Sequence, residues 1–122
     1  MGVTPFLMFE GRAEEAMSFY VSLFEDGAIT RIERADHGVH QAEFTLNGQS
    51  ILAIDSPVKH AFTFTPAMSL FVTCDDEAQL DRLYGQLIEG GEALMPLGDY
   101  GFSRKFGWVN DRFGVSWQLN LP

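Results

Sequence analysis

Cysteine is almost absent from this sequence, and basic residues are scarce. The 122 residues include one cysteine, Cys74, so no disulfide can form within the chain. Lys and Arg number 8 against 17 Asp and Glu, which gives a formal net charge of −9. An acidic surface repels phosphate groups, so we expect no nucleic-acid partner and no binding to anionic membranes.

Long hydrophobic runs are also missing. No apolar stretch approaches the roughly 20 residues that a membrane-spanning helix needs. The N-terminus lacks the basic region and the small-residue cleavage site of a secretory signal. We therefore expect a cytoplasmic protein. Hydrophobic residues make up 46% of the chain and include 11 Phe, which is enough for one core, so residues 1–122 are predicted to form a single domain.

Two segments show helical periodicity. In residues 12–24 and 77–89, apolar side chains recur every three or four positions, which predicts amphipathic helices. Asp76 and Gln79 resemble a capping box before the second helix, and Gly27 and Gly91 are natural stops after the two helices.

The remaining segments favour strands. Residues 39–46 alternate between apolar and polar side chains, and Asn47-Gly48 is a strong hairpin signal. Residues 57–66 are predicted to be a connector. The other predicted strands cover residues 4–9, 30–35, 50–55, 67–74, 93–97, 104–110 and 115–121.

The two halves of the chain repeat the same pattern. Shifting the first half by 64 residues places Gly27 on Gly91 and Phe44 on Trp108. The pseudo-repeats span residues 1–55 and 67–122, and each has the order βαβββ. One such unit cannot cover both faces of its own sheet. The sequence therefore predicts an α+β fold, in which two βαβββ modules form a cupped mixed sheet with helices outside.

Several motifs carry a resemblance to a known family. They are Thr4 to Phe9, Ala16 to Tyr20, Phe62 to Val72 and the long terminal run from Phe106 to Leu119. These stretches resemble the PhnB-like, 3-demethylubiquinone-9 3-methyltransferase-like branch of the vicinal-oxygen-chelate (glyoxalase/bleomycin resistance/dioxygenase) superfamily. The resemblance implies the glyoxalase/bleomycin resistance fold and a homodimer.

The resemblance also implies where a divalent metal would bind in catalytic relatives. The corresponding positions here are Pro5, Ser69, Gln118 and the neighbourhood of Ile54. Pro and Ile offer no metal-binding side chain, and Ser and Gln are poor ligands for ions that prefer imidazole, carboxylate or thiolate. We therefore predict no metal and no cofactor. A surface metal pair formed by His37 and His40 remains a minor alternative.

Methyl transfer is not supported by the sequence. The glycine-rich turn after a first strand, typical of S-adenosylmethionine enzymes, is absent, and 122 residues leave little room for a seven-stranded domain. Acid–base chemistry without a metal has three weak candidates, Glu43, Asp55 and His60, and a solvent-facing position is the favoured interpretation of each. Cys74 ends a predicted strand and precedes two carboxylates, which favours a structural thiol.

The aromatic residues suggest a small-molecule cavity with a few polar groups. Trp117 and Gln118 should point to opposite faces of their strand, and residues 99–102 are a candidate lid. The leading hypothesis is a metal-independent protein that binds a small, partly aromatic molecule, with a sequestering or resistance role. The alternatives are a metal-dependent lyase, isomerase or dioxygenase of the same superfamily, and a non-catalytic structural dimer. The candidate ligand-binding residues are Phe6, Met8, Phe64, Ser69, Phe71, Tyr100, Trp108, Phe113 and Gln118.

Overall fold

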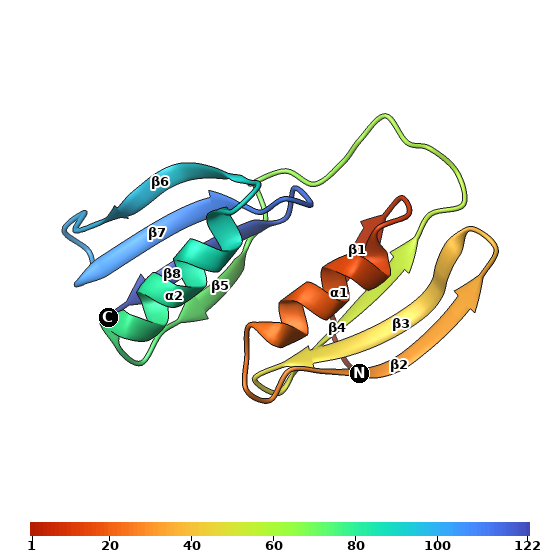
Figure 1. Ribbon diagram of the computed structural model, residues 1–122, viewed down its shortest axis with the longest axis horizontal. Helices are drawn as coiled ribbons and strands as arrows, with labels where there is room; N and C mark the ends of the chain where they lie inside the picture. Colours follow the sequence, from red (N-terminus) through yellow and green to blue (C-terminus); the bar gives the residue numbers. More distant parts are fainter. The chain divides into compact units, whose positions relative to one another are not determined.

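The computed structural model describes residues 1–122, which form two compact units, Met1–Ala61 and Phe62–Pro122. Each unit contains four strands and one helix (Figure 1). No helix combines the length and the hydrophobicity that crossing a membrane requires.

The first unit is a βαβββ module. Its four strands form one sheet in the order β1-β4-β3-β2, in which β1 runs parallel to β4 and the other pairs are antiparallel. In chain order its elements are β1 (Phe6–Phe9), α1 (Ala13–Ser22), β2 (Ala28–Ala35), β3 (Gly38–Leu46) and β4 (Gln49–Asp55).

The second unit repeats this topology. Its sheet has the order β5-β8-β7-β6, again with one parallel pair, β5 and β8. The elements are β5 (Leu70–Thr73), α2 (Glu77–Ile88), β6 (Glu92–Gly98), β7 (Lys105–Asn110) and β8 (Ser116–Leu121). The predicted α+β class and the two βαβββ modules are confirmed, with one four-stranded mixed sheet in each module.

Two details of the sequence prediction need correction. The strand predicted over residues 67–74 covers only Leu70–Thr73, because Pro66 has no N–H to donate and the Met68 N–H turns back to the Thr65 carbonyl at 3.4 Å. The overlay of Phe44 on Trp108 is also wrong, as the pairing registers of the two hairpins show.

The two hairpins differ in turn length. Two residues separate the last pair of β3 and β4, whereas five separate the last pair of β7 and β8. A uniform shift of 64 residues therefore cannot align both hairpins. Buried Phe44 pairs with Ile51, and the matching buried pair in the second sheet is Val109 with Trp117.

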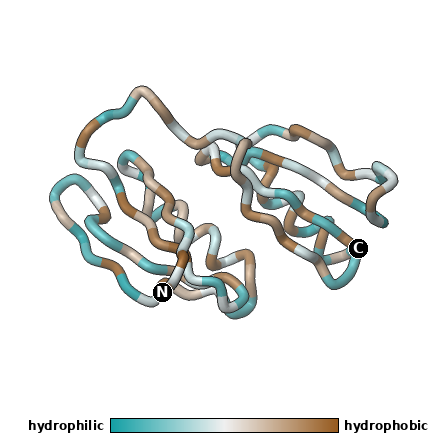
Figure 2. Tube along the Cα trace, turned by 180° about the vertical axis from the view of Figure 1, so that it is seen from behind, coloured by the Kyte–Doolittle hydropathy of each residue, from teal (hydrophilic) through white to brown (hydrophobic).

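Alternation along the strands builds each core. In β4, Ile51, Ala53 and Asp55 are buried, and the residues between them are half-buried. Figure 2 shows hydrophobic and hydrophilic residues succeeding one another at short intervals along the strands. Because side chains alternate between the faces of a strand, each sheet has one face beneath its helix and one face turned away from it.

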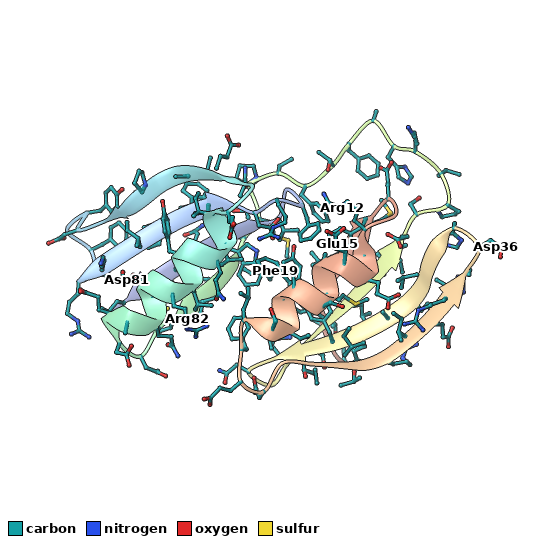
Figure 3. All side chains as sticks on the ribbon, viewed as in Figure 1. Arg12, Glu15, Phe19, Asp36, Asp81 and Arg82 are labelled. Atoms are coloured by element: carbon teal, nitrogen blue, oxygen red, sulfur yellow. The ribbon has the colours of Figure 1, made fainter.

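An ion pair ties each helix to its own sheet. In the first unit, Arg34 of β2 lies 2.7 Å from Glu14 of α1, and this hydrogen bond lowers the pKa of Glu14. In the second unit, Lys105 of β7 lies 2.8 Å from Asp81 of α2 (Figure 3 labels Asp81). Both pairs are solvent-exposed, so they orient the helices more than they stabilise the fold.

The start of α2 is capped by its own side chains. The carboxylate of Asp76 accepts a hydrogen bond from the Gln79 N–H at 2.8 Å, as the sequence predicts. The Gln79 side chain accepts from the N–H of Asp75 rather than from that of Asp76. The capping interaction is therefore reciprocal but displaced by one residue from the standard capping box.

Candidate functional site

The candidate site lies on the face of the second sheet that is turned away from α2. The other face, beneath α2, carries the buried side chains of Trp117, Leu119 and Leu121. Gly107 pairs with Leu119 on that buried face, and a Cβ at Gly107 would lie 2.9 Å from the Tyr84 ring of α2. Residues that alternate with these, including Gln118, therefore point to the opposite face, which we call the open face of unit 2.

The strand register places the open-face residues in rows across the sheet. Gln118 is paired with Phe71 on one side and with Trp108 on the other. Ser116 and Ser69 lie in the neighbouring row, where their hydroxyl groups are 2.7 Å apart. The sheet therefore brings together four predicted ligand-binding residues, Ser69, Phe71, Trp108 and Gln118.

A chain of hydrogen bonds connects the polar groups of the open face. The Trp108 Nε1–H donates to Ser116 Oγ at 2.8 Å. Ser116 Oγ and Ser69 Oγ share a hydrogen bond, and Gln118 Nε2 donates to Ser69 Oγ at 3.2 Å. The indole and the amide are therefore held in fixed orientations by two hydroxyl groups.

Sequence reasoning left Ser116 out of the candidate site. Ser116 is only 1% exposed, yet its hydroxyl is the link between Trp108 and Ser69. The signal was present, because Ser116 is two residues from Gln118 in a strand and the two must share a face. It could be used only once the strand pairing was known, since the β7–β8 register places Trp108 within reach of Ser116 and the β5–β8 pairing does the same for Ser69.

Aromatic rings cluster at the far end of the same face. Phe106 pairs with Asn120 in the row beyond Gln118, and its ring centroid lies 4.9 Å from that of Phe102 and 6.3 Å from that of Tyr100. The Tyr100 hydroxyl donates to the Pro96 carbonyl, which anchors the loop between β6 and β7. Phe102 is 62% exposed, so the predicted lid presents a ring to solvent.

The other predicted ligand-binding residues are placed separately. Phe64 lies in the connector, 3.9 Å from the position that a Cβ on Gly114 would occupy. Phe113 is half-buried in the β7–β8 turn, where its N–H donates to Asp111. In the first unit, Phe6 and Met8 pair with Leu52 and Ile54 on the face of that sheet away from α1.

The three weak catalytic candidates have different surroundings. Asp55 is 2% exposed, and its two oxygens accept three backbone N–H bonds, from Gly11, Ala13 and Val39. Asp55 therefore anchors the start of α1 and of β3. Glu43 is half-buried on the face that carries Phe6. His60 lies in the connector, where its Nε2 is 2.8 Å from Ser56 Oγ.

Cys74 is a buried thiol at the end of β5. Burial, helped by the nearby carboxylates of Asp75 and Asp76, raises its pKa to about 11. A thiol with so high a pKa is a poor nucleophile near neutral pH.

The residues at the superfamily's metal positions do not fit a divalent ion. Ser69 and Gln118 are hydrogen-bonded to each other, and the Pro5 carbonyl accepts from the Leu52 N–H at 2.9 Å. Ile54 has no donor atom in its side chain. No group of three or more His, Cys, Asp or Glu side chains is arranged to hold a metal.

The turn after β1 does not fit the S-adenosylmethionine cofactor of a typical methyltransferase. Such sites use free backbone N–H groups at a glycine-rich turn and at the start of a helix. Here the N–H groups of Gly11 and Ala13 both donate to Asp55 Oδ1, at 2.7 and 3.0 Å. The chain's own carboxylate already fills the position that an anionic ligand group would take.

Comparison with solved structures shows the same fold over the whole chain. A PhnB protein from Bacillus cereus is 56% identical, with 100% of both chains covered and a TM-score of 0.97. A glyoxylase/bleomycin resistance protein/dioxygenase domain from Frankia sp. EAN1pec is 17% identical, with 99% of this chain and 91% of that chain covered and a TM-score of 0.72.

A further structure with this fold is TnmS3, an antibiotic binding protein from Streptomyces sp. CB03234. It is 18% identical, with 100% of this chain and 97% of that chain covered and a TM-score of 0.57. A search of curated proteins gives no match. The 3-demethylubiquinone-9 3-methyltransferase family matches residues 1–120. The chain shares the fold of the glyoxylase/bleomycin resistance protein/dioxygenase domain. By its match to the family and its likeness to the PhnB protein, it belongs to the PhnB-like 3-demethylubiquinone-9 3-methyltransferase family.

Proposed function

We propose that the protein binds a small, partly aromatic molecule on the open face of unit 2, without a metal ion. The observation that carries the proposal is the hydrogen-bonded chain of Trp108, Ser116, Ser69 and Gln118 beside an exposed ring, Phe71. A sheet face with fixed polar groups between aromatic rings has the properties that small-molecule recognition requires.

Exposure of the rings supports this role. Phe71 is 57% exposed and Phe102 is 62% exposed, although burying a Phe side chain is worth roughly 1.5–3 kcal/mol. Rings left in water on the same sheet face as oriented polar groups are available to stack on a ligand. The net charge of −9 favours neutral or cationic molecules over anionic ones.

We propose that this binding serves to sequester a small molecule or to confer resistance to it. TnmS3, which shares the fold, is an antibiotic binding protein. In this chain, the buried and fully hydrogen-bonded Asp55 and the raised pKa of Cys74 leave few reactive groups for catalysis. We also propose that the protein is a cytoplasmic homodimer, as the resemblance and the composition suggest.

The family's methyltransferase name does not enter the proposal. The N–H groups at the start of α1 that could hold an anionic group of a cofactor are bonded to Asp55. Each unit has a four-stranded mixed sheet, whereas a typical S-adenosylmethionine enzyme has one seven-stranded doubly wound sheet. We infer that binding, and not methyl transfer, is the activity to measure.

The test combines mass spectrometry with a titration. Native mass spectra of the freshly purified protein should show a co-purified small molecule or, after its removal, binding of added metal-free bleomycin as a probe. Binding should also change the fluorescence of Trp108, and the Trp108→Phe variant should lose this signal because the remaining Trp117 is buried beneath α2.

The proposal would be overturned by two results together: no co-purified molecule, and no response to bleomycin or to a panel of aromatic compounds. A stoichiometric metal in the purified protein, lost together with binding, would overturn its metal-independent form. Sedimentation velocity at several protein concentrations tests the dimer.

A further inference from the structure

The hydrogens of the open-face chain can be assigned from the partners of Ser116. An indole N–H only donates, so Ser116 Oγ accepts the hydrogen bond from Trp108. Ser69 Oγ is the other partner of that hydroxyl. Because Ser116 is 1% exposed, its own hydrogen must go to Ser69, or a buried donor would be left without a partner.

This assignment determines what Ser69 can offer. Ser69 Oγ accepts from Ser116 and from Gln118 Nε2, which uses both of its lone pairs. The O–H of Ser69 is then a donor to which no acceptor within the protein is bonded. Ser69 is half-buried rather than buried, and its hydroxyl lies on the open face, where a ligand can meet this donor.

The amide of Gln118 offers the complementary group. Its nitrogen is engaged with Ser69, and no group of the chain donates to its oxygen, Oε1. Gln118 is half-buried and lies in one row with Phe71 and Trp108. The open face therefore presents a hydrogen-bond donor and a hydrogen-bond acceptor side by side, next to an exposed ring.

We propose that this pair recognises a planar lactam or carboxamide, in which a carbonyl and an N–H lie on one edge of the molecule. The ligand carbonyl accepts from the Ser69 hydroxyl, its N–H donates to Gln118 Oε1, and its ring stacks on Phe71. The inference rests on the proposed binding function and names the chemical class of the ligand.

The same geometry disfavours other chemical classes of ligand. A carboxylate presents two acceptors, so one of them would face Gln118 Oε1, and the net charge of −9 repels it further. An ether or a tertiary amide lacks the N–H and would leave Gln118 Oε1 unpaired. Leaving one such partner unpaired costs about 1–3 kcal/mol, which corresponds to roughly five- to 150-fold in affinity.

The experiment compares quinolin-2-one with N-methylquinolin-2-one. The two compounds share the ring and the carbonyl, and only the first has the N–H. Proton–nitrogen correlation NMR on the labelled full-length protein follows the Trp108 Nε1–H and the side-chain amide of Gln118 during each titration. We expect N-methylquinolin-2-one to bind about tenfold more weakly.

Variants separate the two hydrogen bonds. Gln118→Met should abolish the difference between the two compounds, because it removes the group that senses the N–H. Ser69→Ala should weaken both compounds by a similar factor and keep their ratio, because both retain the carbonyl. Thr73→Ala is the matched control, since Thr73 is exposed on β5 and pairs with Asn120, one row beyond Gln118.

The outcomes distinguish this inference from the proposed function. Equal affinity of the two compounds for the wild-type protein would overturn the lactam inference and leave small-molecule binding intact. The same holds if Gln118→Met keeps the tenfold difference. If neither compound shifts the signals, the lactam inference fails, and the bleomycin titration with mass spectrometry then decides whether the binding function fails as well.

Discussion

Trp117 donates its indole N–H to the carboxylate of Asp111 at 2.9 Å, inside the second unit. Trp117 is 1% exposed and Asp111 is 3% exposed. The other carboxylate oxygen accepts from the backbone N–H groups of Phe113 and Val115. One side chain therefore closes the β7–β8 turn and holds Trp117 beneath α2. Gln118 is in consequence held on the open face.

Removal of this carboxylate should destabilise the protein strongly. Asp111→Ala would leave a buried indole N–H and two turn N–H groups without an acceptor. We expect a loss of about 3 kcal/mol in the free energy of unfolding, measured by urea denaturation. Trp117→Phe removes the indole donor together with part of the buried ring. The double variant should lose less than the sum of the two single variants. Strict additivity would contradict this account.

Asp55 should have a comparable structural role in the first unit. Asp55→Ala would deprive Gly11, Ala13 and Val39 of their hydrogen-bond acceptor. We expect a loss of about 3 kcal/mol and faster amide hydrogen exchange at the start of α1. Asp36→Ala is the control, because Asp36 is exposed at the tip of the β2–β3 hairpin (Figure 3). A similar loss in both variants would refute a specific role for Asp55.

Alanine substitutions at two glycines, one within α2 and one just after it, should change the stability of the protein in opposite directions. A Cβ on Gly91 would lie 2.1 Å from the backbone oxygen of Asn110, so Gly91→Ala must displace the backbone and should cost about 2 kcal/mol or more. Gly85 is exposed within α2 and has no atom within 4 Å of such a Cβ. Gly85→Ala should stabilise the protein by about 1 kcal/mol, as thermal unfolding of both variants can show.

The pKa of Cys74 predicts slow alkylation and a pH dependence of stability. Its pKa is raised from 9.0 to about 11, so at pH 8 the native thiolate fraction should be roughly a hundredfold lower than in the unfolded chain. Iodoacetamide should therefore modify the native protein at least that much more slowly than the protein in urea. Equal rates would show that the thiol is not protected.

The sign of the pH effect follows from proton linkage. Between pH 9 and 11, the folded state holds the thiol proton that the unfolded state has released. The contribution of the Cys74 thiol to the free energy of unfolding is fully present below pH 9 and is lost as the pH rises toward 11. The Cys74→Ala variant should lack this part of the decline, which urea denaturation at several pH values can measure.

The sequence by itself was sufficient for the repeated βαβββ order and for the family. Helical periodicity placed α1 and α2, and alternation with Asn47-Gly48 placed β3 and β4, because both patterns reflect local backbone geometry. The alternation of Trp117 and Gln118 also predicted correctly that the two side chains point to opposite faces of the sheet. The absence of metal-ligand side chains at Pro5 and Ser69 could likewise be read directly from the residue types.

Only the tertiary structure decided which side chains meet. The five-residue turn between β7 and β8 sets the register that pairs Trp108 with Gln118, and this register is a non-local property that no single-strand pattern contains. The parallel pairing of β5 with β8 brings Ser69 to Ser116, 47 residues away. Asp55, a candidate base in the sequence, becomes a buried anchor because three backbone N–H groups converge on it only in the folded unit.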